Sequence, residues 1–350
     1  MGKEIKEIQM VFILGKERSG TSLLQNMLNA HPTIVAPSES KFAVLFYPKF
    51  GHVKKWSEQD VLRFADALYT EPLFAHVWHP DKKKLIDELL AVKDNADYGI
   101  MCKVAYLQMK NDKINVQLIS DKNPHYVLFT DTLLRIFPAA KFIHIVREPR
   151  DNIYSHITSF KGKNTIFTAY QWLGFNSIVE ENKRKMPQAY FTVIYEDLVN
   201  NTESVMRNLC GFLKIEYNPE MKENKPLSSI SNEFVKTEMA ERAAAINDQL
   251  TKPLTSDNIG KWKNGMSAYD RKVTEIVTAD FARKLYNYEI EIDITNKVSV
   301  PAIKLLYGRY LYNTWAAFTR FRFRYLAINR AYLKYKKAVK GDKLPYWEYY

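Results

Sequence analysis

Residues 9–22 read QMVFILGKERSGTS and carry the strongest structural pattern in this chain. The apolar run 10–14 has the length and the β-branched and aromatic content of a strand buried on both faces. A glycine-bracketed loop follows, and then Leu24, Met27 and Leu28 recur at helical spacing. A strand, a glycine loop and a helix in this order gather backbone N–H groups and the positive end of a helix dipole. The stretch therefore predicts an α/β fold with a phosphate or sulfate site at this loop.

The glycine spacing comes close to that of a Walker A loop, because four residues separate Gly15 from Gly20. A Walker A loop continues with Lys and Ser or Thr, whereas this chain has Thr21 and Ser22. A simple tight turn is the plain structural alternative. A P-loop kinase or NTPase is the functional alternative; it would lack its phosphate-binding lysine and would need an acidic Mg²⁺ ligand such as Asp121.

The surrounding residues narrow these alternatives. The run RSGTSLL at 18–24, followed by MLNAHP at 27–32 and by Glu39, resembles the 5′-phosphosulfate loop of sulfotransferases that use 3′-phosphoadenylyl sulfate (PAPS). The tyrosylprotein sulfotransferases and their bacterial relatives are most similar, over roughly residues 8–290. The resemblance implies a P-loop-like, doubly wound parallel sheet with helices on both faces. It also implies that PAPS binds at the loop residues Arg18, Ser19, Gly20, Thr21 and Ser22.

The resemblance also implies the catalytic groups. Glu39 follows a predicted strand at 33–36 and matches the family's catalytic base. Lys122 follows a predicted strand at 115–120 and matches the lysine that stabilises the transition state, with Arg18 helping to neutralise the leaving bisphosphate. His125 is the rival base, because cytosolic small-molecule sulfotransferases use a histidine shortly after the corresponding lysine. We favour Glu39.

Three further positions match the family's cofactor site. Arg147 ends a buried strand predicted at 141–146, and its planar guanidinium suits phosphate oxygens. Ser155 lies eight residues later, as in the family's 3′-phosphate motif. Tyr195, after a predicted strand at 190–194, matches a tyrosine that faces the nucleotide, and Lys261 matches a cofactor-contacting lysine before a tryptophan. We expect the loop around Lys261 to fold over the nucleotide.

Two positions depart from the family pattern. Relatives have a further arginine where this chain has Ser159, so that phosphate contact is in doubt unless Lys161 replaces it. Relatives also have a transition-state serine where this chain has Ile246, and Asn247 is the only neighbouring substitute that we identify.

The remaining segments divide the chain. We predict a sulfotransferase domain over 1–290, with a helical, aromatic-rich insertion at 41–100 on the acceptor side, and a basic helical extension over 291–350. Helical spacing relates six apolar residues of the extension: Phe318, Phe321, Tyr325, Ile328, Tyr332 and Tyr335. This face either packs on the body or on a second subunit, or lies on an anionic membrane surface. Binding of nucleic acid is the least favoured interpretation.

Charge and cysteine content also bear on the predicted function. The net charge is +12, but residues 301–350 hold eleven Lys or Arg and two acidic residues, so most of the basicity belongs to the extension. Cys102 and Cys210 have no metal-ligand spacing, and we expect buried thiols and no metal. With no secretory signal or membrane span evident, we expect a cytoplasmic protein, with peripheral membrane contact as an option.

The predicted reaction is transfer of a sulfuryl group from PAPS to an acceptor hydroxyl. We favour a lipophilic alcohol, such as a sterol or a lipid, over a glycan, a phenol or a peptide tyrosine. Besides the P-loop kinase, the other alternative is a catalytically inactive nucleotide-binding protein of the same fold. Retention of Arg18, Glu39, Lys122 and Arg147 argues against an inactive protein.

Overall fold

The protein is built on a parallel sheet of five strands. The structure, a computed structural model, describes residues 2–160, 164–222, 256–285 and 298–340. The strand order is β2-β3-β1-β4-β5, and every pairing in the sheet is parallel. The strands are β1 (Gln9–Leu14), β2 (Ile34–Val35), β3 (Leu118–Lys122), β4 (Lys141–Val146) and β5 (Tyr190–Ile194). Since the chain moves from β1 first to one side and then to the other, the sheet is doubly wound, and the predicted fold class is confirmed.

The strand bounds differ from the predicted ones mainly at β3. β4 and β5 begin and end where the sequence predicts. β3 begins three residues late, at Leu118, because Asn115 takes a left-handed conformation with φ 57°, which a strand does not accommodate. β3 also continues through Asp121 and Lys122, which were predicted to follow it. These two side chains therefore point to opposite faces of the sheet.

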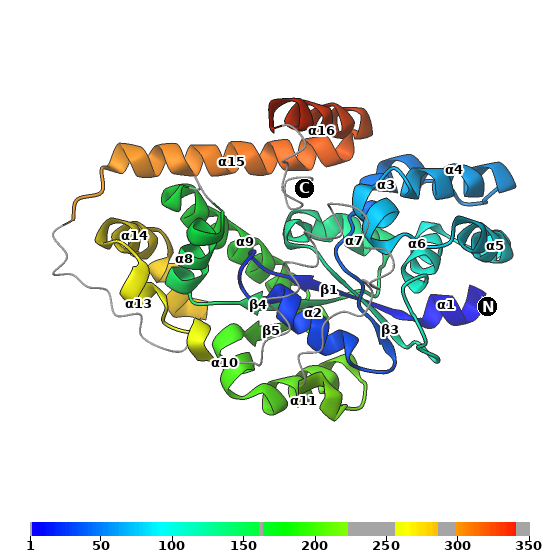
Figure 1. The fold of residues 1–350 in the computed structure, drawn as a ribbon, viewed down its shortest axis with the longest axis horizontal. Helices are drawn as coiled ribbons and strands as arrows, with labels where there is room; N and C mark the ends of the chain where they lie inside the picture. The colour runs from blue at the N-terminus through cyan, green and yellow to red at the C-terminus, as the bar shows by residue number, and fades with distance from the viewer. Residues whose placement is uncertain (1, 161–163, 223–255, 286–297, 341–350) are drawn as a thin grey trace.

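Helices cover both faces of the sheet. Alternate residues of β1 belong to two separate hydrophobic cores, with Phe12 in one and Val11 and Ile13 in the other. The core around Phe12 includes residues of α3 (Phe42–Phe50), α6 (Tyr98–Leu107), α7 (Thr130–Ile136) and α9 (Thr165–Lys185). The core around Val11 and Ile13 includes residues of α2 (Thr21–Asn29), α10 (Tyr195–Asn200) and α11 (Thr202–Leu213), which lie below the sheet in Figure 1.

The segment predicted as a helical insertion is helical. Between α3 and α6 it holds α4 (Glu58–Leu68), the π-helix η1 (Phe74–Trp78), α5 (Lys82–Val92) and η2 (Lys93–Asn95). α4 begins at a capping box, in which Ser57 and Asp60 each accept a hydrogen bond from the other's backbone N–H. Most of the segment's aromatic rings are buried against one another; Phe42, for example, packs edge-on against Phe74 at 5.6 Å. Core packing therefore accounts for most of these rings.

The body of the protein also contains both cysteines and several shorter helices. Cys102 and Cys210 are buried free thiols, as expected. The remaining elements of the body are α1 (Gly2–Glu7), η3 (Pro124–Phe129), α8 (Pro149–Ser159), η4 (Pro187–Ala189), η5 (Pro219–Lys222), η6 (Ser256–Asn258), α13 (Trp262–Gly265) and α14 (Ala268–Leu285).

The C-terminal extension forms two helices that break at Tyr325, α15 (Ala302–Arg324) and α16 (Leu326–Lys340). α15 lies along α9 (Figure 1), and Gly174 of α9 makes room for Tyr312, whose hydroxyl would lie 2.1 Å from a Cβ at that position. Phe318 and Phe321 of the predicted apolar face are exposed, so on α15 this face does not pack on the body of the protein. The inner face instead consists of Gly308, Tyr312, Ala316, Thr319, Arg322 and Phe323.

Periodicity could not choose between the two faces of α15, because both carry aromatic residues. Among the helices that the structure describes, none combines the length and the hydropathy needed to cross a bilayer.

Candidate active site

The loop after β1 is shaped to present backbone N–H groups. Arg18 and Gly20 have positive φ values of 70° and 91°, and Gly20 precedes the first residue of α2. No side chain caps the N-terminus of α2, so its first N–H groups have no side-chain acceptor. A Cβ at Gly20 would lie 2.5 Å from the ring of Tyr195, so both the conformation and the space require glycine. The loop thus has the donors and the helix dipole that bind an anion.

Arg18, Arg147, Ser155 and Tyr195 meet beside this loop. The Arg18 Nε donates to the Ser155 Oγ at 3.1 Å, and the Arg147 Nη1 donates to the carbonyl oxygen of Arg18 at 3.0 Å. The Arg147 guanidinium lies 4.8 Å from the centre of the Tyr195 ring. The structure therefore brings together four residues that are distant in sequence and that were predicted to bind the cofactor.

Arg18 and Arg147 place two positive charges close together. Burial lowers the pKa of Arg18, and the neighbouring Arg147 lowers it further. Within the described ranges, no salt bridge involves either arginine, and the buried Arg147 Nε has no hydrogen-bond partner there. A cationic pair of this kind, with Arg147 buried and Arg18 partly buried, is stabilised by an anion. The nucleotide phosphates of PAPS fit this requirement.

Glu39 and Lys122 form an ion pair next to the loop. The same Lys122 Nζ lies 3.1 Å from the Ser22 Oγ, at the start of α2. Lys122 is almost completely buried, whereas a fifth of the Glu39 side chain is exposed (20%). The lysine therefore joins the anion-binding loop to a carboxylate that reaches solvent.

Residues of the 41–100 segment and of η3 hold the backbone that carries Glu39. The Trp78 Nε1 donates to the carbonyl oxygen of Ser38 at 3.0 Å, and the Tyr126 hydroxyl donates to that of Ser40 at 2.9 Å. The Ser40 Oγ donates to Glu71 at 2.8 Å, and burial raises the pKa of this glutamate. Side chains on both sides of Glu39 thus fix its position.

His125 does not join the Glu39–Lys122 pair. Its ring lies against Trp315, 5.7 Å between ring centres, and against Phe175 at 6.5 Å. Burial, followed by the positive charge of Lys41, holds the pKa of His125 well below its ordinary value. A neutral imidazole can accept a proton, but one with a low pKa is a weak base.

Asp121 faces the opposite side of β3. It is fully buried and accepts a hydrogen bond from the Tyr106 hydroxyl at 2.5 Å. Burial raises its pKa to about 7. Asp121 therefore points into the core and not toward the loop, which removes the Mg²⁺ ligand that the kinase alternative requires.

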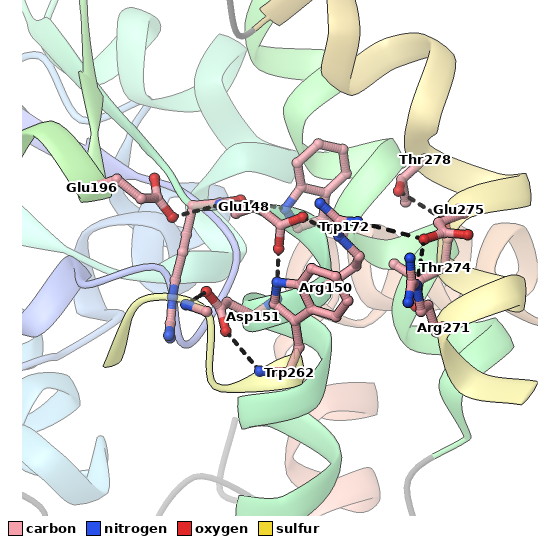
Figure 2. Close-up of polar contacts among 12 residues, drawn as sticks. Glu148, Arg150, Asp151, Trp172, Glu196, Trp262, Arg271, Thr274, Glu275 and Thr278 are labelled. Carbon is pink, nitrogen blue, oxygen red and sulfur yellow. Dashed lines mark hydrogen bonds and ion pairs between the residues drawn. The ribbon is translucent and has the colours of Figure 1, made fainter. Parts of the chain in front are cut away.

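The loop at 256–262 is fastened to the N-terminus of α8. Asp151 accepts hydrogen bonds from the backbone N–H groups of Gly260 at 2.6 Å and of Trp262 at 3.1 Å, and Figure 2 shows it pointing toward this loop. The Arg150 guanidinium stacks 3.9 Å from the centre of the Trp262 ring. The Arg147 Nη2 donates to the carbonyl oxygen of Asn258. The loop thus contacts the arginine predicted to bind phosphate.

Lys261 is joined to neither the loop after β1 nor Arg147 by a hydrogen bond or ion pair within the described ranges. Its Nζ donates to the Asn258 Oδ1 at 2.7 Å, and the residue is exposed. Ser159 is exposed at the end of α8. The predictions for Lys161, Ile246, Asn247 and the segment 248–253 lie outside the described residues.

Sequence reasoning missed the residues that support the site. The Asn152 Nδ2 donates to the carbonyl oxygen of Glu17 at 2.8 Å and to the Ser19 Oγ at 2.9 Å, and so holds the loop from α8. Glu148 caps α8 by accepting from the N–H of Asp151 at 2.8 Å. Polar residues in the first turn of the helix after β4 were the available signal, because that turn lies at the same sheet edge as the loop.

A search with protein-family models matches residues 10–219, more than half of the 350-residue chain, to the sulfotransferase family. The chain belongs to the sulfotransferase family.

Several named proteins are similar to this chain. Protein-tyrosine sulfotransferase 1 of Danio rerio is 24% identical over 73% of this chain and 66% of its own length. The protein-tyrosine sulfotransferase of Drosophila melanogaster is 25% identical over 73% of this chain and 47% of its own length. An uncharacterized protein of Aquifex aeolicus is 28% identical over 80% of this chain and 34% of its own length. The matched region thus spans from a third to two thirds of these relatives.

Two solved structures share the fold. The sulfotransferase domain from the Synechococcus PCC 7002 olefin synthase superposes with a TM-score of 0.51 at 22% identity, over 81% of this chain and 95% of that domain. The sulfotransferase domain from the curacin biosynthetic pathway gives a TM-score of 0.50 at 19% identity, over 79% of this chain and 98% of that domain. At these identities the likeness establishes the fold.

Proposed function

We propose that this chain catalyses transfer of a sulfuryl group from PAPS to an acceptor hydroxyl. The donor binds with its phosphosulfate at the loop 18–22 and its 3′-phosphate at Arg147 and Ser155, and its base lies near Tyr195. Family membership supports this assignment, and so do the N-terminus of α2, which no side chain caps, and the neighbouring guanidinium groups of Arg18 and Arg147.

The single observation that carries the proposal is the position of Lys122. Its ammonium contacts Ser22 at the anion-binding loop and Glu39 on the other side. Glu39 accepts the proton of the attacking hydroxyl, a general-base role that contributes about 10²–10⁴-fold. Lys122 and Arg18 stabilise the negative charge that develops on the departing phosphate oxygen. PAPS supplies the sulfuryl group.

The geometry gives the two alternatives less support. The kinase alternative assigns Asp121 to Mg²⁺, but Asp121 points into the core, and the carboxylate that lies beside the loop, Glu39, pairs with Lys122. An inactive binding protein would not need a carboxylate and a lysine paired next to the phosphosulfate loop. We also propose that the reaction needs no metal, because Arg18, Arg147 and Lys122 offset the charge of the donor. The described residues include no group of three or more metal-ligating side chains.

For the acceptor we propose a lipophilic alcohol. The rings of Trp315, Phe175 and Phe167 pack together beside His125 of η3, and the partly exposed rings of Trp315 and Phe167 are apolar groups that an acceptor could contact. Two of the named relatives are protein-tyrosine sulfotransferases, so a peptide tyrosine is the second candidate. We further propose a cytoplasmic enzyme that touches membranes through the exposed apolar residues of α15.

Calorimetric titration with 3′,5′-bisphosphoadenosine (PAP), run beside Mg-ATP, tests the proposal. We expect PAP to bind much more tightly than Mg-ATP and Arg147→Gln to weaken PAP binding at least tenfold, since hydrogen bonds to charged groups contribute about 1.5–3 kcal/mol each. Arg135→Gln, at an exposed position in the last turn of α7, is the matched control and should leave PAP binding unchanged. Preference for Mg-ATP, or no binding of either nucleotide, would refute the proposal.

A further inference from the structure

The segment that carries Glu39 is held by side chains. Residues 36–41 connect β2 to α3 and belong to neither a helix nor a strand. The backbone carbonyl oxygens of residues 37, 38 and 40 accept hydrogen bonds from three buried side chains, one each from α2, η1 and η3. The donors are, in that order, the Gln25 Nε2, the Trp78 Nε1 at 3.0 Å and the Tyr126 hydroxyl at 2.9 Å. Since regular structure does not support this backbone, these bonds decide where the Glu39 carboxylate lies.

Both ends of the π-helix η1 contact this segment. Glu71, three residues before η1, accepts from the Ser40 Oγ at 2.8 Å and from the backbone N–H of Phe74 at 2.6 Å, and the same carboxylate oxygen accepts both bonds. Trp78, the last residue of η1, donates to the carbonyl oxygen of Ser38 at 3.0 Å and to its Oγ at 3.1 Å. The residues before and after the proposed base are therefore both attached to η1. Single π-helical turns are rare and often lie at functional sites.

The aromatic core of the 41–100 segment holds η1 in place. Only 5% of Trp78 is exposed, and Glu71 is buried to the same degree. The Trp78 ring packs against three other rings, with ring centres 5.3–5.8 Å apart: Phe42, Phe74 and Tyr106. Close-packed surroundings leave such side chains little room to move. The π-helix is therefore a rigid support for residues 38–40.

We propose that Glu71 and Trp78 are positioning residues for the proposed base. They fix residues 38–40, so that the Glu39 carboxylate lies beside Lys122 at the anion-binding loop. This inference rests on the proposed sulfuryl transfer and adds two residues to its site. A displacement of about 1 Å in a reacting group can cost about 10²-fold in rate. Loss of either support should therefore slow turnover and leave binding of PAP nearly unchanged.

A purely structural role in the core is the competing explanation. It predicts that any loss of activity accompanies a loss of stability, and that a similar change elsewhere in the core has the same effect. Trp56 provides the comparison, because it is buried in the same core and its Nε1 has no hydrogen-bond partner within the described ranges. The positioning role requires instead that the effect pass through Glu39.

The test measures turnover and PAP binding in the full chain. Labelled PAPS is supplied with dodecan-1-ol, with 4-methylphenol or with water alone as the acceptor. Trp78→Phe removes the indole N–H and keeps an aromatic ring, so we expect kcat to fall about tenfold or more while the dissociation constant of PAP stays within about threefold. Trp56→Phe makes the same chemical change and should leave both values within about threefold of wild type.

Glu71 is tested by a severe and a conservative change. Glu71→Ala removes the acceptor of both bonds and should lower kcat about tenfold or more. Glu71→Gln should retain more turnover than Glu71→Ala, because one amide oxygen can accept from both Ser40 and Phe74. Ser40→Ala removes only the bond to Glu71 and should lower kcat several-fold, which keeps the test informative where a larger change prevents folding. Ser57→Ala, which removes the capping box of α4, should lower thermal stability and leave kcat unchanged.

A double substitution with Glu39→Gln separates the two roles. If Trp78 acts through the base, Trp78→Phe should cost less than about threefold once Glu39 no longer accepts a proton. An undiminished effect in this background would overturn the inference, and so would unchanged kcat in Trp78→Phe, Glu71→Ala and Ser40→Ala. With an active wild type, these results refute this inference alone. A wild-type protein that transfers the sulfuryl group to none of the three acceptors refutes the proposed function.

Discussion

Neighbouring residues of β3 point to opposite faces of the sheet, so one side chain faces the candidate site and the next one packs in the core. Lys122 faces the anion-binding loop and contacts Glu39, whereas Asp121 faces the core and accepts from Tyr106. Each residue reaches its place through the two-residue period of a strand. A shift of one residue in the pairing with β1 would exchange them.

Asp121→Asn should change how stability depends on pH. The folded protein keeps the proton on Asp121 up to about pH 7, but the unfolded chain loses it near the ordinary value of 3.8. The folded state therefore binds more protons between these values, and its stability falls as pH rises through them. The neutral variant escapes this loss, so its stability relative to wild type should rise by on the order of 1–4 kcal/mol between pH 4 and pH 8.

Urea unfolding at pH 4, 6 and 8 measures this difference. Asp112→Asn, which removes an exposed carboxylate, is the control and should follow the wild-type curve. Parallel curves for wild type and Asp121→Asn would show that Asp121 is ionised in the folded protein.

Glu39→Gln should abolish most turnover and leave binding of PAP within about threefold of wild type. The amide cannot accept the acceptor's proton, so the rate should fall by about 10²–10⁴-fold. His125→Gln should cost less than tenfold, because His125 lies against aromatic rings and apart from the Glu39–Lys122 pair. Turnover is measured with labelled PAPS and the acceptor that a screen selects. A larger loss in His125→Gln than in Glu39→Gln would make the histidine the base.

At the scale of elements, α8 organises the nucleotide side of the site. Its first turns carry Arg150, Asp151 and Asn152, which hold Trp262, the 256–262 loop and the loop after β1 respectively. Figure 2 shows Arg150 and Arg271 converging on Glu275 of α14. The N-terminal end of α8 thus connects the loop after β1, the 256–262 loop and α14 beside Arg147.

Asp151→Ala should therefore weaken PAP binding without unfolding the protein. The change removes the acceptors for the N–H groups of Gly260 and Trp262, and the loop that carries Asn258 loses its attachment beside Arg147. We expect the dissociation constant for PAP to rise about tenfold or more, as hydrogen bonds to a carboxylate suggest. Asp280→Ala on the exposed surface of α14 is the calorimetric control. Unchanged affinity in Asp151→Ala would separate the loop from nucleotide binding.

At the scale of the whole molecule, the extension has two unlike faces. Its inner face packs on α9 and η3, whereas its outer face leaves large apolar residues in solvent between basic ones. The exposed apolar residues of α15 at helical spacing are Ile303, Leu306, Tyr307, Tyr310, Phe318 and Phe321. An apolar stripe flanked by Arg and Lys suits an anionic lipid surface.

We expect the protein to sediment with vesicles that contain anionic lipid and not with neutral ones, and expect salt to weaken the binding. Phe318→Ser combined with Phe321→Ser should reduce the bound fraction several-fold, because these rings would enter the interface. Leu62→Ser, an equally exposed apolar site on α4, should not. Elution as a dimer that the double variant converts to a monomer would instead make a second copy the partner of this face.

The strand–loop–helix unit and the bounds of β4 and β5 could be read from the sequence alone, and so could four positions that the structure brings to the candidate site: Arg18, Glu39, Lys122 and Arg147. These features depend on short-range patterns, and the carboxyl ends of parallel strands bring such residues together at one sheet edge. Three features depend on the folded arrangement: Asp121 belongs to the core, Trp78 holds the backbone beside Glu39, and Asp151 holds the 256–262 loop. The folded arrangement also decided which face of α15 is buried. These outcomes depend on contacts between segments far apart in the sequence, and a helix with aromatic residues on both faces carries no local signal that selects one of them.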